Sequence, residues 1–231
     1  MKTVVHITGT SSGLGKGLAE FFCAQSDTLV HGYSRRESIH DSHYTHHSVD
    51  LTDKASEVIL ALSDEADREI LINNAGWLGP VNPIGHLESE SVSRIFELNV
   101  SAVMRWTNHF TKNSRAKNRV VVSISSGAAQ HPISSWSAYC ASKAAVDMMT
   151  RVWAEEEKSV TYLSIAPGVV DTEMQGDIRS KSKSEFPDLE RFISMHEEGE
   201  LKSPHEVAEI IGEIALWPDN APSNVFSVRD L

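Results

Sequence analysis

Short β-branched runs alternate with longer amphipathic stretches along almost all of this 231-residue chain. The apolar runs predict strands, and the stretches between them predict helices. A strand–helix repeat of this kind makes consecutive strands run parallel, with helices covering both faces of one sheet. We therefore predict an α/β fold: one domain over residues 1–231, with a doubly wound parallel sheet of about seven strands.

The boundaries of these elements follow from the pattern. Strands are predicted over residues 4–7, 28–33, 43–49, 69–72, 119–124, 160–165 and 223–228. Helices are predicted after the first strand and over residues 52–66, 88–113, 137–156 and 204–216. The last of these begins with a Ser cap, a Pro and a Glu. Residues 174–201 are polar, irregular and partly helical in pattern, and we predict a mobile flap over a site there.

A glycine-rich turn follows the first strand and opens the first helix. Strand, glycine turn and helix together present a helix N-terminus to a phosphate, and the glycines let the backbone approach a pyrophosphate closely. This is the arrangement of a Rossmann fold. The predicted cofactor contacts in this turn are Gly9, Ser11, Ser12, Gly13, Leu14 and Gly15.

The residues after the second strand indicate which dinucleotide binds. An acidic residue there would hydrogen-bond the ribose of NAD, whereas an Arg accommodates the 2′-phosphate of NADP. This chain has Ser34, Arg35 and Arg36 and no acid, so we predict NADP(H). The alternative is an exposed, solvated arginine pair. Asp50, after the third strand, is expected to meet the adenine end.

Tyr139 and Lys143 are four residues apart in the predicted helix 137–156. That spacing puts both side chains on one helix face. A neighbouring ammonium favours the phenolate, so Lys143 is expected to lower the pKa of Tyr139. A Tyr tuned in this way can exchange a proton with a carbonyl oxygen or an alcohol.

The unusual short motifs all fall at the carboxyl ends of predicted strands, where ligands bind in such sheets. They include residues 73–76, Ser126 and residues 167–172. The further cofactor contacts predicted at these ends are Asn74, Ala75, Gly76, Pro167, Gly168, Val170 and Thr172, together with Tyr139 and Lys143.

Over essentially its whole length the chain resembles the short-chain dehydrogenase/reductase family. The glycine turn, Asn73-Asn74-Ala75-Gly76, Ser126 and the Tyr139-x-x-x-Lys143 pair match the motifs of that family. The resemblance implies that Asn99, Ser126, Tyr139 and Lys143 are catalytic. Ser126 would polarise the substrate carbonyl, Tyr139 would supply the proton, Lys143 would also bind the nicotinamide ribose, and Asn99 would hold a water.

Within the family the chain looks most like the sepiapterin reductase and benzil reductase branch. The resemblance implies an NADPH-dependent carbonyl reductase acting on an aromatic or vicinal diketone. Trp136 and Met174 would form a flat apolar pocket, and Asp230 is the candidate anchor near the C-terminus. Relatives commonly pair through the long helices, so a homodimer or homotetramer is expected.

Composition limits the other possibilities. The net charge of −11 disfavours nucleic acid and anionic membranes as partners. Cys23 and Cys140 are the two cysteines, and the sequence shows no leader pattern, so a reduced cytoplasmic chain is expected. His40, His43, His46 and His47 lack partners with ligand-like spacing, so a polar edge or loop is predicted there and no metal.

Two other function classes fit some of these features. The first is an NADP(H)-binding redox sensor or scaffold without turnover, which the intact Asn99, Ser126, Tyr139 and Lys143 set disfavours. The second is a sugar-nucleotide epimerase, which the short length of the chain disfavours.

Overall fold

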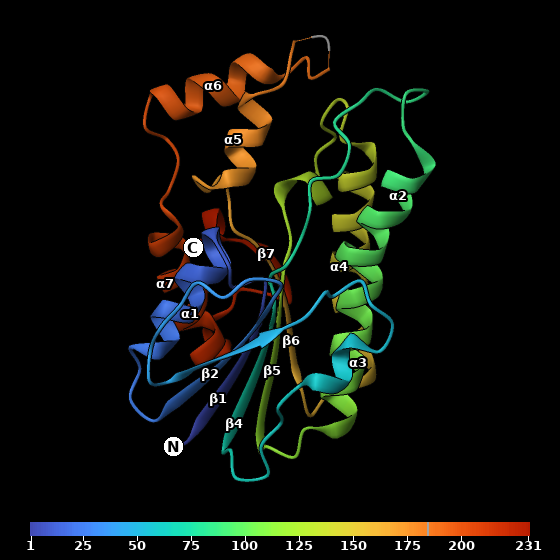
Figure 1. Cartoon of the computed structure of the whole chain (residues 1–231). Coiled ribbons are helices and arrows are strands. Elements are labelled where there is room, and N and C mark those ends of the chain that lie inside the picture. Colours follow the sequence, from blue (N-terminus) through green and yellow to red (C-terminus); the bar gives the residue numbers. More distant parts are fainter. Residues whose placement is uncertain (184) are drawn as a thin grey trace.

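In the computed structural model, which describes residues 1–183 and 185–231, seven parallel strands form one sheet (Figure 1). The order across the sheet is β3-β2-β1-β4-β5-β6-β7. Strand order therefore reverses beside β1, where a ligand crevice forms at the carboxyl ends of such sheets. The doubly wound α/β fold is confirmed. The strands are β1 (Thr3–Thr8), β2 (Thr28–Ser34), β3 (Tyr44–Ser48), β4 (Arg68–Asn73), β5 (Asn118–Ile124), β6 (Thr161–Ala166) and β7 (Val225–Ser227).

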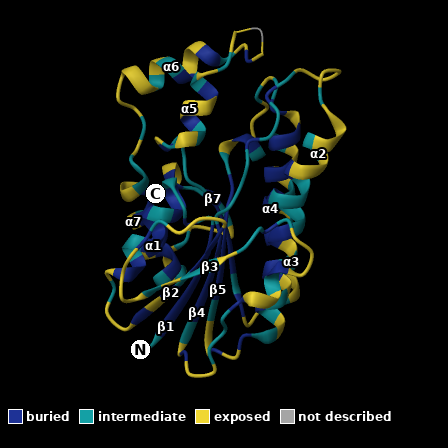
Figure 2. Cartoon of the chain, viewed as in Figure 1, coloured by how far each residue is buried: buried dark blue, intermediate teal, exposed yellow. Residues whose placement is uncertain are grey.

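Helices cover both faces of the sheet. α1 and α7 pack on one face, whereas α3 and α4 pack on the other (Figure 1). Alternate strand residues serve the two cores: Ile70 faces α1 and α7, and Leu71 faces Trp106 of α3. The central strands are accordingly buried along their length (Figure 2). The helices are α1 (Gly13–Cys23), α2 (Ser89–Phe96), α3 (Val103–Asn113), α4 (Ser137–Glu156), α5 (Glu173–Arg179), α6 (Leu189–Glu197) and α7 (Pro204–Leu216).

The helix predicted over residues 52–66 is wrong. Only a short 3₁₀ turn, Ser56–Ile59, forms there, because Ala55 adopts a left-handed conformation with φ of 63°. Polar contacts fix this irregular segment instead of helical hydrogen bonds. The Ser56 hydroxyl donates to the Leu51 carbonyl and accepts from Trp106 Nε1, and the Ala61 amide donates to the Tyr33 hydroxyl.

The helix predicted over residues 88–113 forms, but a π-helical turn, Glu97–Ala102, interrupts it between α2 and α3. Asn99 lies in this turn. π-helical turns are rare and occur frequently at functional sites. The capping box at Ser203 and Glu206 is present at the start of α7, as predicted. No helix among the described residues is long and apolar enough to cross a membrane.

Candidate active site

The glycine turn packs against the end of β4. Gly9 has φ of +75°, and a Cβ there would lie 2.9 Å from Ala75 Cα. A Cβ on Gly15 would lie 2.1 Å from the Gly9 carbonyl oxygen and 2.3 Å from Asn74 Nδ2. Glycine is therefore required at both positions by close approach of neighbouring atoms.

The N-terminus of α1 carries no side-chain cap, and the Ser12 hydroxyl donates to the Glu173 carboxylate (3.4 Å). Ser12 at its cap makes no capping hydrogen bond, and the first turn contains no acidic residue. A Cβ on Gly13 would lie 3.2 Å from Thr172 Cγ2, so the turn also touches the segment after β6. Ser11 is half-buried beside Ser12, and Leu14 turns into the core. The helix dipole and the lack of a side-chain cap together favour a phosphate here.

Thr8, at the end of β1, opens the glycine-turn motif but was not among the predicted contact residues. Its hydroxyl accepts hydrogen bonds from the amides of Asn74 (3.0 Å) and Ala75 (3.1 Å). The Asn74 side chain in turn donates to the carbonyls of Thr8 (2.9 Å) and Gly9 (3.2 Å). These bonds fix the ends of β1 and β4 together. The Thr-Gly pair before the turn was the available signal.

The two arginines after β2 are exposed, and among the described residues neither has an ion-pair partner within 4.0 Å. Ser34 is buried, and its hydroxyl donates to the Arg36 carbonyl (2.8 Å), so it shapes this turn. Asp50 accepts two hydrogen bonds from Thr52, which lower the pKa of its carboxyl. The positive charge of Arg35 contributes to the same shift.

Tyr139 and Lys143 lie on α4 with both side chains buried. Lys143 Nζ is 5.8 Å from the centre of the Tyr139 ring and donates a hydrogen bond to the Ile124 carbonyl (2.8 Å). A Cβ on Gly76 would lie 3.4 Å from Lys143 Nζ and 3.5 Å from Asn99 Oδ1. The absence of a side chain at Gly76 thus keeps the approach to both groups open.

The expected lowering of the tyrosine pKa is wrong in this state. Burial raises the pKa of Tyr139 to about 12, although a hydrogen bond with Ser126 opposes the rise. The Lys143 ammonium donates to a backbone carbonyl instead of the phenol, so it does not offset the loss of hydration. Burial lowers the pKa of Lys143 to about 8, and the charge of Asp147 opposes that fall.

Ser126 and Asn99 complete the predicted catalytic set. Ser126 ends the loop after β5, where its hydroxyl accepts from the Ala128 amide (3.2 Å) and also bonds with Tyr139. The Asn99 side chain accepts from the Trp77 amide (2.9 Å) and donates to the Trp77 carbonyl (2.9 Å) and the Ser142 hydroxyl (3.1 Å). Hence the Asn99 amide fixes the loop after β4 against α4.

Asp147 is a second position that the sequence analysis missed. It is buried one turn after Lys143 on α4 and accepts hydrogen bonds from Ser125 Oγ (2.6 Å) and Ser164 Oγ (2.7 Å). It therefore ties α4 to the ends of β5 and β6. Its signal was an acid four residues after the lysine, on the same helix face.

An aromatic cluster covers the tyrosine. Trp136 is 5 % exposed, meets Tyr139 edge to face at 5.6 Å, and stacks on Phe186 at 5.3 Å. Phe192 of α6 lies 5.4 Å from Trp136, and Met174 of α5 packs against the same cluster. The two phenylalanines were not predicted. In Figure 1, α5 and α6 stand above the carboxyl edge of the sheet.

The segment after β6 crosses the same edge of the sheet. Pro167 and Gly168 lead out of β6, and a Cβ on Gly168, where φ is +79°, would lie 3.6 Å from Arg229 Nε. Val170 is buried and bridges to Lys202. Asp230 is exposed, and its carboxylate accepts from the Ser227 amide (2.8 Å) in a local capping box.

The histidines of residues 40–47 have separate surroundings. His40 is exposed, His43 contacts the Cys23 carbonyl, and His47 lies 3.0 Å from His31 and stacks on Tyr33. In the part of the chain that the structure describes, no group of three or more His, Cys, Asp or Glu side chains is arranged to hold a metal ion.

Comparisons with known proteins agree with this geometry. The family described as short chain dehydrogenase matches residues 3–183. Benzil reductase ((S)-benzoin forming) from Bacillus cereus is 39% identical over 228 residues, covering 90% of this chain and 91% of the relative. Sepiapterin reductase from Xenopus tropicalis is 38% identical over 133 residues, covering 55% and 50%. The crystal structure of a short chain dehydrogenase/reductase from Saccharomyces cerevisiae superposes with a TM-score of 0.87 at 27% identity, covering 98% and 96%.

Proposed function

The chain belongs to the short-chain dehydrogenase family and is an oxidoreductase, and on that premise we propose that it reduces an aromatic or vicinal diketone with NADPH. The observation that carries the proposal is the meeting of Ser126, Tyr139 and Lys143 beneath Trp136 at the carboxyl edge of the sheet. A hydroxyl pair, an ammonium and an aromatic wall together suit a flat carbonyl compound.

Tyr139 is proposed as the proton donor. The phenol is protonated at neutral pH and can give a proton to a carbonyl oxygen, although burial raises its pKa to about 12 and so makes it a weaker acid in this state. The nicotinamide, when bound, supplies the hydride that the carbonyl carbon accepts. As the new alcohol O–H forms, Lys143 is proposed to turn from the Ile124 carbonyl, which it contacts in this structure, and to stabilise the charge left on the phenol oxygen. Ser126 donates a hydrogen bond to the same carbonyl oxygen.

The glycine turn supports binding of the dinucleotide, because no side chain caps the N-terminus of α1, where the backbone amides can meet its phosphates. Arg35 and Arg36 are proposed to bind the 2′-phosphate of NADPH, since both are exposed beside the end of β2. Asp50 would lie near the adenine. Thr172, whose methyl group lies 3.2 Å from where a Cβ on Gly13 would stand, would help to hold the nicotinamide end.

Residues 174–201 are proposed to cover the substrate. Phe186 and Phe192 close over Trp136, so an aryl ring can replace the phenylalanine contacts when the segment opens. Met174 and Trp136 would then line the pocket. Asp230 stays a candidate anchor, although its carboxylate already caps the Ser227 amide.

Self-association through α3 and α4 is proposed as well. Met104, Met148 and Val152 are large apolar side chains exposed on these helices, and the last two are four residues apart on one face of α4. Met148→Glu should therefore reduce the molar mass measured by light scattering, whereas an unchanged mass would exclude this face as the interface.

The test of the proposed reaction is consumption of NADPH by purified protein with benzil or another α-diketone. Loss of the nicotinamide absorbance, with formation of the hydroxyketone, supports the proposal. Binding of NADPH without consumption of any carbonyl would instead favour a cofactor-binding sensor.

The double variant Arg35→Ala/Arg36→Ala should weaken the affinity for NADPH by about 10- to 100-fold and the affinity for NADH little, because only NADPH loses phosphate contacts. The charge-matched control is Lys54→Ala/Arg115→Ala, at exposed cations outside the site.

A further inference from the structure

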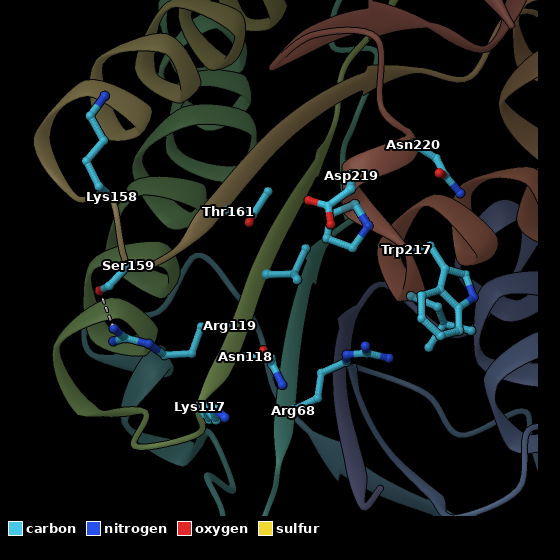
Figure 3. Close-up of a pocket in the computed structure, with 13 residues that line it drawn as sticks. Arg68, Lys117, Asn118, Arg119, Lys158, Ser159, Thr161, Trp217, Asp219 and Asn220 are labelled. Carbon is cyan, nitrogen blue, oxygen red and sulfur yellow. Dashed lines mark hydrogen bonds between the residues drawn. The ribbon is translucent and has the colours of Figure 1, made fainter.

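A hollow of about 440 Å³ opens at the amino edge of the sheet, the edge opposite the candidate active site (Figure 3). Segments distant in sequence form it: the starts of β4, β5 and β6 and the turn between α7 and β7. None of the motifs discussed above lies there. The site is therefore separate from the proposed reaction.

At the floor of the hollow, the side chains on one face of the sheet change from apolar to polar. Ile70 and Val120 belong to the core beneath α1 and α7. Two residues earlier on the same face, Arg68 and Asn118 are register partners at the start of β4 and β5. α7 ends at Leu216, and Trp217 and the 3₁₀ turn Pro218–Asn220 form the adjoining wall. Arg68 and Asn118 both line the hollow beside Thr161, and the Asn118 side-chain amide also donates to the Asp67 carbonyl (3.4 Å).

Cationic side chains surround the hollow, although the whole chain carries a net charge of −11. The lining contains four cations and one carboxylate, Asp219; the cations are Arg68, Lys117, Arg119 and Lys158. Lys158 is paired with Glu155, and Arg119 donates to Ser159 and to the Thr111 carbonyl. Hence two of the four cations are already engaged within the chain.

The other two cations have no such partner. Among the described residues, neither Arg68 nor Lys117 lies within 4.0 Å of a carboxylate. The Arg68 guanidinium is only half exposed and stacks on Trp217, 5.5 Å from the ring centre. Burial lowers the pKa of Arg68, as expected for a partly desolvated charge that lacks an anion. Figure 3 shows the guanidinium on the same wall of the hollow as Trp217.

We propose that this hollow binds a compact oxyanion with two or more negative charges, of the phosphate or polycarboxylate class. Arg68 would offer two parallel N–H donors to the oxyanion, and Lys117 would add a second charge at the rim. Asn118, Thr161 and Asn220 supply neutral polar contacts around them. A small ligand is favoured over nucleic acid because the acidic remainder of the chain repels an extended polyanion.

The test is titration of the full-length chain with inorganic pyrophosphate and, separately, with citrate, followed by calorimetry and by fluorescence. Because Trp217 is one of five tryptophans, the signal from the hollow is the difference between wild type and Trp217→Phe. If only pyrophosphate binds, the site is assigned to phosphates; if only citrate binds, it is assigned to polycarboxylates. Binding of neither at millimolar concentration would overturn the proposal.

Variants decide whether the signal comes from the hollow. Arg68→Gln should weaken binding by about tenfold, the loss of one charge-assisted contact, and Lys117→Ala by about threefold. Lys54→Ala, the control at an exposed lysine away from the hollow, should leave it unchanged. Neither pocket variant should alter the NADPH affinity. Equal binding by wild type and Arg68→Gln would place the anion elsewhere and exclude the hollow as its site.

Discussion

Two buried charged groups, Glu69 on β4 and Lys143 on α4, have their polar atoms satisfied in opposite ways. The Glu69 carboxylate accepts from the Ser63 amide (2.7 Å) and the Ser114 hydroxyl, and His6 Nε2 lies 3.6 Å away. Burial would raise the pKa of Glu69, but these neighbours hold it below its usual value. The carboxylate thus has its partners within the fold.

Lys143 is different. An ammonium has three donors, and among the described residues one of them has a hydrogen-bond partner, the Ile124 carbonyl. The ammonium lies beside Gly76, where an added Cβ would stand 3.4 Å from Nζ. Burial accordingly lowers the pKa of Lys143 to about 8. The contrast teaches that a buried charge satisfied by its own chain stabilises the fold, whereas one with spare donors is available to a ligand.

The Tyr139→Phe variant is the most direct test of the catalytic side of this comparison. Removing the proposed proton donor should lower kcat by about 10³-fold while the NADPH affinity and the melting temperature stay near wild type. Tyr162→Phe is the matched control, because Tyr162 is also a buried tyrosine and its hydroxyl bonds with Thr111. Steady-state kinetics and cofactor titration measure both. A Tyr139→Phe enzyme with full activity would remove this residue from the mechanism.

The sequence was sufficient for the parallel sheet and for the shared helix face of Tyr139 and Lys143, whereas Ser126 was placed beside them by the family resemblance. Their motifs sit at strand ends or one helical turn apart, so local spacing determines their place. It was not sufficient for residues 52–66. There the left-handed Ala55 and the Trp106–Ser56 bond, which joins residues fifty positions apart, override the amphipathic pattern.

The contacts between the histidine rings of neighbouring strands could not be predicted from the sequence either. His6, His31 and His47 come from three different strands, and only the strand order brings their rings together. The same is true of Phe186 and Phe192, which reach Trp136 through the fold of the segment after β6. Contacts of this kind depend on tertiary structure and cannot be predicted from a local sequence pattern.

Glu69→Gln should affect stability where Tyr139→Phe affects catalysis. The amide would turn a donor toward the Ser63 amide or the Ser114 hydroxyl, which costs about 2–3 kcal/mol of unfolding free energy. Urea denaturation measures the loss, and kcat per folded molecule should not change. Glu65→Gln, at an exposed glutamate on the preceding loop, is the control and should leave the urea midpoint in place. A loss of kcat with unchanged stability would contradict the structural role of Glu69.

The histidines beside Glu69 predict a loss of stability in acid. Burial, reinforced by His6 and His47, lowers the pKa of His31 from 6.5 to about 4, and the pKa of His47 is lowered too. Since the fold favours neutral His31, stability is complete above pH 6.5 and falls as the pH drops from 6.5 toward 4. The loss should be about 2 kcal/mol after allowing for partial exposure. His31→Asn should flatten the pH dependence of the melting temperature over this range, while His40→Asn, at an exposed position, should not.

The smallest effect should come from Asp147→Asn, which separates the electrostatic role of Asp147 from its structural one. Asparagine keeps an oxygen that can accept from Ser125 and Ser164, so the link between α4 and the strands should persist. What disappears is the charge that raises the pKa of Lys143. If the ammonium is the active form, activity is lost as the pH rises through about 8 in wild type. In the variant this alkaline limb should move to lower pH by roughly half a unit to one unit.

The control is Glu156→Gln, which replaces an exposed acid at the end of the same helix and should not move the alkaline limb. If the alkaline limb of the pH–activity profile stays in place while circular dichroism shows an intact fold, the charge of Lys143 does not govern the reaction. The contrast with Glu69 would then concern stability alone.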